Sequence, residues 1–378
     1  MENALRMPLE RPKWAIGVLL NDFQLGGCER VAIRLANAWA EMGIRVILYV
    51  ADNCGSLAAE LGRNVEVKFA DPPIRPSALQ SLRLGWWAGR RMLADGVTRC
   101  FLPGNSQFDG ALPLLLATRH RVPVYAKISN PLWRPDRSWL GNTVFSVLTR
   151  IRLAGVAGLA ALSPRLLRHD EVAIDLANRG RVLPDAMGAR WPSTDGVPRR
   201  AHHLCAVGRL VPQKNMALAL HSVALLEDLP VTLTVVGDGP EMQPLRALAR
   251  SLGIASRVQF TGAVPDCTPY MAEAEALLST SRYEGYPAVM IEALTAGTFL
   301  IAGRSTCAME DIVRSPLLGR IVENSSAQAF AQAIREFFAS PHRSAHERRR
   351  ELARSLFSGH LDAASSRAYL AFMRPPVE

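Results

Sequence analysis

Two glutamates in the second half of the chain have a spacing that could bind a sugar nucleotide. Seven residues separate Glu284 from Glu292, and Pro287 between them suits the first turn of a helix, where its missing amide hydrogen is harmless. Glu284 is therefore predicted in the loop before this helix, and Glu292 about two turns along it. Free amides at a helix start favour phosphate, and carboxylates accept hydrogen bonds from sugar hydroxyls. The alternative is that Glu284 caps the helix and Glu292 is an exposed helix residue.

Strands and helices alternate on both sides of a linker at residues 190–199, which holds two prolines and a glycine. Short apolar runs are typical of buried parallel strands. The chain is therefore predicted to be an α/β protein with two doubly wound, Rossmann-like domains that face each other across a cleft. The predicted strands of the first half are residues 14–20, 45–50, 100–102, 122–128 and 158–162, with a helix at 28–42. Those of the second half are residues 204–207, 232–236, 258–261, 276–279 and 299–302, with helices at 216–226, 242–252 and 287–296.

Residues 200–325 resemble the retaining family-4 glycosyltransferases of the GT-B fold. The matching pieces stand in register at residues 208–210, 214, 236–240, 258–262 and 281–297, and the last of them carries the family's Glu-x7-Glu motif. The first half is similar only weakly, at residues 25–30. The resemblance implies an acceptor-binding domain at residues 1–190, a donor-binding domain at 200–355, and a terminal helix at 356–378 that packs back on the first domain. It also implies transfer of a hexose-type sugar from a UDP- or GDP-linked donor to a glycan, without a cofactor.

By resemblance, four charged residues of the second domain are expected to bind the donor. Arg209 and Lys214 follow the first strand of the second domain and are expected to bind the donor diphosphate in place of a metal ion. Glu292 is expected to bind the ribose hydroxyls, and Glu284 the hydroxyls of the transferred sugar. The predicted catalytic residues are therefore Arg209, Lys214 and Glu284. The alternative for the two cations is that they are solvated loop residues.

Four more residues are expected close to the donor phosphates. By resemblance, Gly285, Tyr286 and Pro287 bring the helix start to the phosphates. Gly27, from the first domain, would approach them without a Cβ in the way. The alternative for Gly27 is an ordinary turn between a strand and a helix.

The first half departs from the family at the acceptor side. Many relatives have a histidine near the end of a strand in the middle of the first domain, whereas residues 124–131 of this chain contain none. Lys127, Ser129 and Asn130 are the candidates for that place, and no catalytic base is assigned. Retention leaves two routes, a covalent glycosyl-enzyme or front-face attack. Because no carboxylate of the first half is obviously placed as a nucleophile, front-face attack is favoured, in which Arg209 and Lys214 stabilise the departing diphosphate.

All of the excess positive charge lies in the first half. Residues 1–200 contain 27 Lys and Arg against 17 Asp and Glu, whereas residues 201–378 contain 17 of each. Tryptophans and arginines gather at residues 81–93 and 132–140, as they do in proteins that bind membrane surfaces. We expect a lipid-linked glycan acceptor and a cytoplasmic enzyme that is peripheral on the anionic inner face of the plasma membrane. The alternative is that the tryptophans are buried and the arginines simply solvated.

Other classes of protein fit the sequence less well. The first fourteen residues have no apolar segment of a secretory signal, no stretch is long enough to span a membrane, and the six cysteines have no metal-ligand spacing. Residues 236–240 suggest a dinucleotide-binding loop, but Met242 stands where its third glycine would be. No nucleic-acid-binding motif is found. A GT-B nucleotide-sugar epimerase and a non-catalytic sugar-nucleotide binder remain as alternatives.

Overall fold

The computed structural model describes residues 14–24, 26–133, 137–168, 179–194 and 196–374. The chain divides into two compact units. Unit 1 comprises residues 1–133, 139–188 and 362–378, and unit 2 comprises residues 134–138 and 189–361. The terminal segment of unit 1 thus begins at Asp362, six residues later than the terminal helix expected from the sequence. Residues 1–13, to which the expectation about a secretory signal refers, and residues 134–136 of the predicted tryptophan–arginine segment lie outside the described residues.

Unit 1 is built on a seven-stranded sheet with the order β3-β2-β1-β4-β5-β6-β7. Every pair of neighbouring strands is parallel. The four central strands are almost entirely buried, which explains their continuous apolar sequences. The strands are β1 (Ala15–Leu20), β2 (Arg45–Val50), β3 (Val65–Phe69), β4 (Arg99–Leu102), β5 (Val124–Lys127), β6 (Gly158–Ala161) and β7 (Gly180–Val182).

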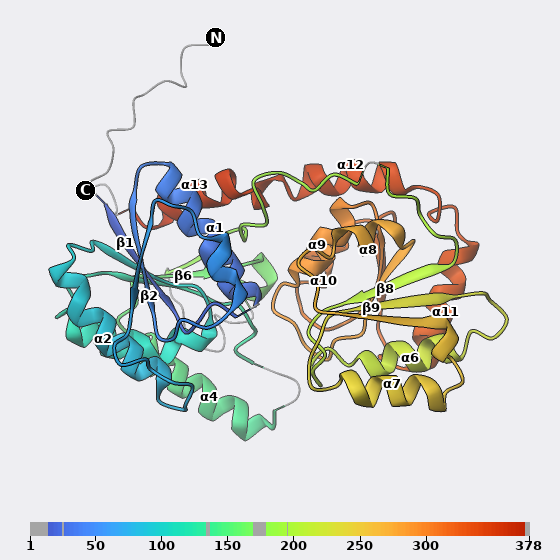
Figure 1. Ribbon diagram of the computed structural model, residues 1–378, viewed down its shortest axis with the longest axis horizontal. Helices are drawn as coiled ribbons and strands as arrows, with labels where there is room; N and C mark the ends of the chain where they lie inside the picture. Colours follow the sequence, from blue (N-terminus) through green and yellow to red (C-terminus); the bar gives the residue numbers. More distant parts are fainter. Residues whose placement is uncertain (1–13, 25, 134–136, 169–178, 195, 375–378) are drawn as a thin grey trace, which may run out of the picture. The chain divides into compact units, whose positions relative to one another are not determined.

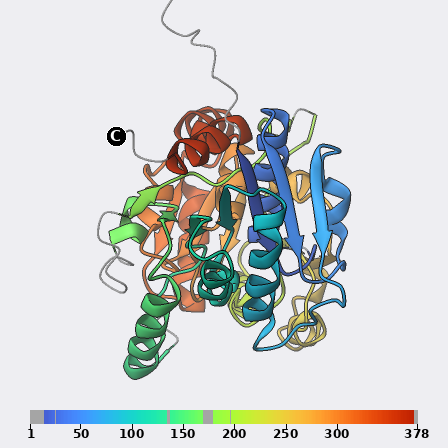
Figure 2. The same cartoon turned by 90° about the vertical axis from the view of Figure 1, so that its left-hand side faces the viewer.

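Helices cover both faces of this sheet (Figures 1 and 2). One face packs against α1 (Gly27–Glu41) and α13 (Asp362–Phe372), around a core that includes Trp39, Phe101 and Tyr369. The indole nitrogen of Trp39 donates a hydrogen bond to the carbonyl of Ser366 in α13 at 3.2 Å. The other face packs against α2 (Gln80–Ala94), α3 (Ala111–Ala117) and α4 (Trp139–Arg152). The short 3-10 turns of the unit are η1 (Ser56–Glu60) and η2 (Asn105–Gly110).

Unit 2 is built on a six-stranded parallel sheet with the order β10-β9-β8-β11-β12-β13. The strands are β8 (His203–Val207), β9 (Thr232–Val236), β10 (Val258–Gly262), β11 (Ala276–Ser279), β12 (Phe299–Gly303) and β13 (Gly319–Val322). The helices are α6 (Met216–Ala224), α7 (Met242–Ser251), α8 (Thr268–Glu273), α9 (Ala288–Thr295), α10 (Met309–Ile312), α11 (Ala327–Ala339) and α12 (His346–Leu356), with 3-10 turns η3 (Ala255–Arg257) and η4 (Ser358–His360). Both units therefore have the doubly wound α/β architecture predicted from the sequence.

A buried arginine of α12 fixes the end of α9. Arg349 is fully buried and donates hydrogen bonds to the carbonyls of Leu317 at 2.8 Å and Gly297 at 2.7 Å. Burial, and secondarily the charge of Arg199, lowers its pKa to about 10. Gly297 follows α9 with a φ of 85°, a left-handed conformation that glycine adopts without strain. The arginine therefore satisfies a carbonyl at a helix end that water does not reach.

Within the described residues, no helix combines the length and the apolar character needed to cross a membrane.

Candidate functional site

Two glycine turns position Arg209 at the carboxyl end of β8. Gly208 precedes the arginine with a φ of 152°, and the amide of Leu210 donates a hydrogen bond to the carbonyl of Asp238 at 2.8 Å. A Cβ on Gly237 would overlap the carbonyl oxygen of Gly208, and one on Gly239 would overlap that of Leu210. The glycines of residues 236–240 therefore let two backbone turns pack together. Arg209 itself is exposed at the tip of its turn.

The loop that carries Lys214 is fastened to the loop that carries Glu284. The amide of Arg282 donates to the carbonyl of Gln213 at 2.8 Å, and the Gln213 side chain donates back to the carbonyl of Tyr283 at 3.0 Å. The Thr280 hydroxyl donates to the carbonyl of Asn215 at 3.0 Å. Three hydrogen bonds thus join segments that are about seventy residues apart in sequence, and they hold the two loops against each other.

An ion pair between Lys214 and Glu284 lies at the centre of this arrangement. The Lys214 Nζ is 2.5 Å from the Glu284 Oε1, with side-chain exposures of 20% and 9%. The amide of Glu284 donates to the carbonyl of Ser305 at 2.8 Å, which ties the glutamate to the loop after β12 as well. The attraction between the two charges is strong because the pair is largely withdrawn from water. The Lys214 side chain nevertheless stays partly exposed to solvent.

The segment after Glu284 leads directly into α9. The carbonyl of Gly285 accepts a hydrogen bond from the Thr306 hydroxyl at 2.8 Å, and the Tyr286 ring stacks on the His360 ring with their centroids 5.8 Å apart. Pro287 was predicted in the first turn of this helix, and in the structure it is the N-cap, one position before the first turn. Because α9 begins at Ala288, Glu292 lies about one turn along it, not two.

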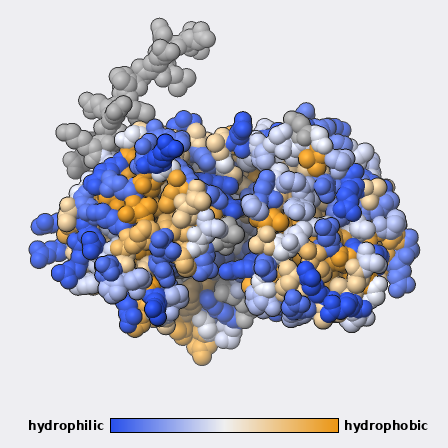
Figure 3. Space-filling model, in the orientation of Figure 1, coloured by the Kyte–Doolittle hydropathy of each residue, from blue (hydrophilic) through white to orange (hydrophobic). Residues whose placement is uncertain are grey.

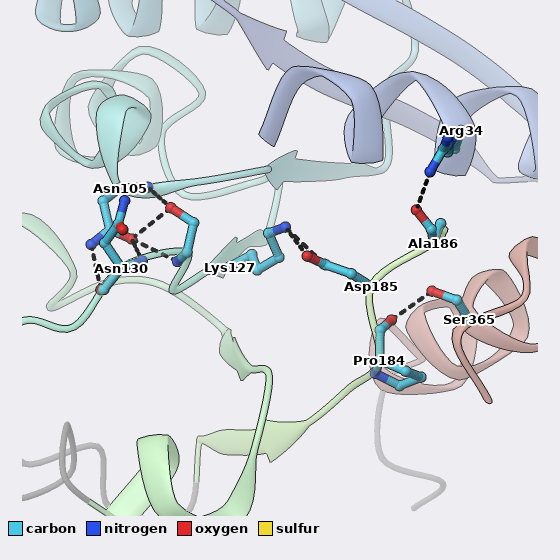
Figure 4. A network of polar contacts seen from close by, with 9 residues as sticks. Arg34, Asn105, Lys127, Asn130, Pro184, Asp185, Ala186 and Ser365 are labelled. Atoms are coloured by element: carbon cyan, nitrogen blue, oxygen red, sulfur yellow. Dashed lines mark hydrogen bonds and ion pairs between the residues drawn. The ribbon is translucent and has the colours of Figure 1, made fainter. Parts of the chain in front are cut away.

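Lys127, an acceptor candidate, is enclosed in unit 1. Its side chain is 1% exposed, and its Nζ lies 2.7 and 3.0 Å from the two carboxylate oxygens of Asp185 (Figure 4). Burial alone would lower the pKa of Lys127, but the charge of Asp185, with that of Cys28 and the hydrogen bond to Asp185, outweighs burial and raises it. Lys127 is therefore a charged structural cation that holds the Asp185 segment to β5.

Ser129 and Asn130 are held by Asn105, which sequence analysis missed. The Oδ1 of Asn105 accepts from the amide of Ser129 at 2.8 Å, and its Nδ2 donates to the carbonyl of Asn130 at 2.9 Å (Figure 4). Asn105 thereby fixes the loop after β5 from the loop after β4. Its place three residues after a buried strand, and next to Gly104, is the signal that could have indicated it. Asp185, which follows β7, could have been found in the same way.

Gly27 is the first residue of α1 and is exposed. A Cβ built on it would have no atom within 4 Å. Packing within unit 1 therefore does not require a glycine at this position, and its expected approach to a donor stays a prediction.

The predicted donor residues Arg209, Lys214, Glu284 and 285–287 thus lie on two neighbouring loops of unit 2, with Glu292 on the helix that follows the second loop. The four other candidates, Gly27, Lys127, Ser129 and Asn130, belong to unit 1. In the described part of the chain, no group of three or more His, Cys, Asp and Glu side chains is arranged to hold a metal ion.

The predicted tryptophan–arginine segments divide into exposed and buried residues. Trp86 is 49% exposed and Trp139 is 71% exposed. Trp87 instead packs on the core, with its ring against Tyr49 at 6.0 Å and Arg91 over it at 5.3 Å. The alternative of a buried tryptophan therefore holds for Trp87, whereas membrane binding by the exposed residues stays a prediction.

The second unit matches a known family. Residues 195–355 match the family model "Glycosyl transferases group 1". The GDP-mannose-dependent alpha-(1-6)-phosphatidylinositol monomannoside mannosyltransferase of Mycolicibacterium smegmatis is 31% identical over 57% of this chain and 58% of its own length. The lipopolysaccharide core biosynthesis glycosyltransferase LpsE of Rhizobium meliloti is 31% identical over 38% of this chain and 41% of its own length. The chain thus matches about half the length of these curated relatives.

Solved structures match nearly the whole chain. Anabaena HepE, solved in complex with UDP and glucose, has a TM-score of 0.74 at 18% identity and covers 94% of this chain and 98% of its own. WaaG, a glycosyltransferase involved in lipopolysaccharide biosynthesis, has a TM-score of 0.73 at 18% identity and covers 95% of this chain and 100% of its own. Residues 195–355 therefore match the group 1 glycosyltransferases, and the whole chain has the two-domain GT-B fold of these solved structures.

Proposed function

We propose that this chain is a retaining, metal-independent glycosyltransferase of family 4 that binds the diphosphate of its donor at the Arg209, Lys214 and Glu284 loops. The observation that carries the proposal is the Lys214–Glu284 ion pair, which hydrogen bonds between loops hold at the carboxyl edge of the unit 2 sheet. Ligands of open α/β sheets bind at this edge. The match of residues 195–355 to the group 1 glycosyltransferases supports the same site.

The charges of the site explain how it would act. Arg209, exposed beside Lys214, supplies a second cation, and together they offset the negative charge that grows on the diphosphate as its bond to the anomeric carbon breaks. The acceptor oxygen then bonds to that carbon on the face the diphosphate leaves, and its proton passes to a phosphate oxygen. This route needs no carboxylate nucleophile and retains the anomeric configuration.

The two glutamates have separate tasks in this proposal. Glu284 is held by Lys214 and by the carbonyl of Ser305, so its second oxygen can accept a hydrogen bond from a hydroxyl of the transferred sugar. Glu292, one turn into α9, is partly exposed and binds the ribose. The Glu292→Ala variant should therefore lose nucleotide affinity, whereas Glu284→Ala should mainly slow transfer. Identical nucleotide titrations of both variants and the wild type would contradict this division.

We further propose that the acceptor is a lipid-linked glycan on an anionic membrane surface, at the inner face of the plasma membrane. The mycobacterial relative acts on a phosphatidylinositol mannoside and the Rhizobium relative in lipopolysaccharide core synthesis, so both work on lipid-borne sugars. The positive charge of residues 1–200 suits such a surface. The donor is a UDP- or GDP-linked hexose.

The experiment is a donor assay on the full chain. UDP- and GDP-linked glucose, galactose, mannose and N-acetylglucosamine are incubated with the protein, with and without EDTA, and release of the nucleotide is measured. We expect one donor to be consumed at the same rate in EDTA, with NMR showing a product of unchanged anomeric configuration. Complete and reversible loss of activity in EDTA would contradict metal independence. Conversion of the donor to its epimer, without transfer, would contradict the transferase assignment.

A further inference from the structure

Helix α4 of unit 1 presents its apolar residues to solvent and its polar residues to the protein. The side chains that it buries against the unit are Asn142, Ser146 and Thr149, at 2%, 7% and 0% exposure. Its large exposed side chains are all apolar except Arg150: Trp139, Leu140, Val144, Val147, Leu148 and Ile151, at 43–71% exposure. This is the reverse of a helix at the surface of a soluble protein, which turns its apolar stripe to the core.

The contacts of α4 with unit 1 show that this orientation is fixed. Arg152 at its C-terminal end forms an ion pair with Asp109 of η2 at 2.5 Å. Phe145 of the helix and Leu153 just after it pack on the core of the unit. The helix is therefore anchored by Phe145, by this ion pair and by its buried small polar residues, and the large apolar residues of the opposite side form an outer stripe about 21 Å long. Figure 3 shows the apolar colour on the exposed end of α4, at the lower edge of unit 1.

The charges of the surface select its partner. Helix α4 contains no acidic residue, and Arg150 stands exposed in its last turn beside the stripe. Helix α2 covers the same face of the sheet, and its large exposed side chains are also apolar or basic: Leu82, Arg83, Trp86, Arg90, Arg91 and Leu93. An apolar stripe bordered by arginines and tryptophans matches an anionic lipid surface, in which the arginines meet headgroups and the apolar side chains enter the acyl boundary.

A second copy of the chain fits this surface less well. In a symmetric dimer the same patch meets itself, and because neither α2 nor α4 contains an acidic residue, their arginines would find no carboxylate on the partner's copies of these helices. An exposed apolar patch of this size is typical of a binding surface. An anionic lipid surface would bury the apolar residues without placing further positive charges next to the arginines.

We propose that the outer face of α4 docks on anionic membranes, with Val144, Val147 and Ile151 inserted into the lipid and Arg150 against the headgroups. This proposal rests on the proposed membrane partner and names the surface that binds it. Because the test uses neither donor nor acceptor, its result is independent of the transferase activity. The sequence-based expectation rested on residues 81–93 and 132–140, of which only Trp139 and Leu140 belong to α4. Val144, Val147 and Ile151 are three of the six large exposed apolar residues of α4, so their loss removes a substantial part of the apolar area that the helix offers to lipid.

The test is flotation of the full chain with vesicles of phosphatidylcholine alone or mixed with phosphatidylglycerol. We expect binding to the mixed vesicles only, weakened by salt. The triple variant Val144→Ser/Val147→Ser/Ile151→Ser should bind at least about tenfold more weakly, because apolar burial drives insertion. Arg150→Glu should bind several-fold more weakly at low salt and nearly as the wild type at high salt, because salt screens the lost attraction. The control Leu225→Ser removes an equally exposed apolar residue of unit 2 and should change nothing.

Donor consumption, measured in parallel, should be the same for all of these variants, which shows that they are folded. Unchanged flotation of the triple variant would overturn the proposal. So would wild-type protein that fails to float, or a dimer in size-exclusion chromatography that the triple variant turns into a monomer, since a second copy would then cover the face.

Discussion

The two units each place a lysine–carboxylate pair at the carboxyl edge of a parallel sheet, but the pairs differ in their access to solvent. In unit 1 Lys127 is 1% exposed and both oxygens of Asp185 bind it. In unit 2 Lys214 is 20% exposed and one oxygen of Glu284 binds it. A sealed pair can only hold the chain in place, whereas an open pair can exchange part of its interaction for a ligand. Chemistry in this molecule is therefore expected at the open pair.

The largest effect is expected on breaking the sealed pair. Lys127→Met leaves the Asp185 carboxylate buried without its cation and should lower the free energy of unfolding by about 3–5 kcal/mol. The double variant Lys127→Met/Asp185→Leu should recover most of that loss. Chemical denaturation measures both. The control is Lys68→Met, which breaks a more exposed pair with Asp95 and should cost about 1 kcal/mol or less. Equal losses for Lys127 and Lys68 would contradict the distinction between sealed and open pairs.

The units should also lose stability at opposite ends of the pH scale. His203, at the start of β8, is 2% exposed and hydrogen-bonded to Thr232 and Thr234. Burial, and then the charge of Arg200, lowers its pKa from 6.5 to about 4. As the pH falls, the imidazole is therefore protonated in the unfolded chain before it is protonated in the folded one. The contribution of His203 to the free energy of unfolding is fully present above pH 6.5 and is lost as the pH falls toward 4, by up to about 3 kcal/mol.

The raised pKa of Lys127 acts in the other direction. The contribution of Lys127 to the free energy of unfolding is fully present below pH 10.5, which is the pKa of a lysine in the unfolded chain. It is lost as the pH rises through the raised pKa of the folded state. Denaturation curves recorded across the pH range, with His203→Gln as the comparison, test both effects. In a plot of the free energy of unfolding against pH, the variant should lose less stability at acid pH than the wild type and should behave as the wild type at alkaline pH. An unchanged acid limb would show that His203 does not cause it.

At the open pair the expected effect is on the rate. Lys214→Ala and Arg209→Ala should each reduce turnover roughly 100-fold, about 2.7 kcal/mol, by removing charge stabilisation from the departing diphosphate. Arg209→Ala should change the free energy of unfolding by about 1 kcal/mol or less, whereas Lys214→Ala should cost more, because it leaves the largely buried Glu284 carboxylate without its cation. Arg335→Ala, which breaks an exposed pair with Asp228 in the same unit, serves as the control and should leave turnover unchanged. Steady-state kinetics that separate kcat from KM decide this, and a loss confined to stability would oppose a catalytic role.

The smallest effect on stability is expected at Gly27. Gly27→Ala adds a methyl group that meets no atom of the protein and lies in the first turn of a helix, so stability should stay within about 1 kcal/mol of the wild type. If Gly27 approaches the donor phosphates, KM for the donor should rise several-fold. Gly237→Ala, where the methyl group would overlap the Gly208 carbonyl, should instead destabilise unit 2. An unchanged donor KM in Gly27→Ala would make this glycine an ordinary turn residue.

The buried strands and the edge strand β10 could be predicted from the sequence, and the edge strands β3, β7 and β13 could not. The predicted bounds of β2 and β11 agree with the structure, because both strands are runs of consecutive apolar residues. The edge strand β3 was missed, since Val65–Phe69 mixes Glu66 and Lys68 with apolar residues and is partly exposed. Strands β7 and β13 were missed for a similar reason, because each is short and carries an arginine.

The contacts of the site lie beyond what a sequence pattern can give. A resemblance pointed to Lys214 and Glu284, but their pairing depends on loops that meet only in the folded unit. The same holds for Lys127 and Asp185, which are 58 positions apart. Helix α4 shows a further limit, because apolar periodicity gives the width of a stripe and not the direction in which it faces. Only the burial of Ser146 and Thr149 shows that the stripe points outward.

The central claim is that the cations of unit 2 hold the diphosphate of a nucleotide-sugar donor. The most direct measurement is calorimetric titration of UDP and GDP, and of uridine and guanosine, into the wild type and into Arg209→Ala and Lys214→Ala. The account predicts that the nucleoside diphosphate which binds the wild type binds each variant at least about tenfold more weakly, while its nucleoside binds all three proteins alike. Equal affinity of the diphosphate for the wild type and both variants would contradict the account.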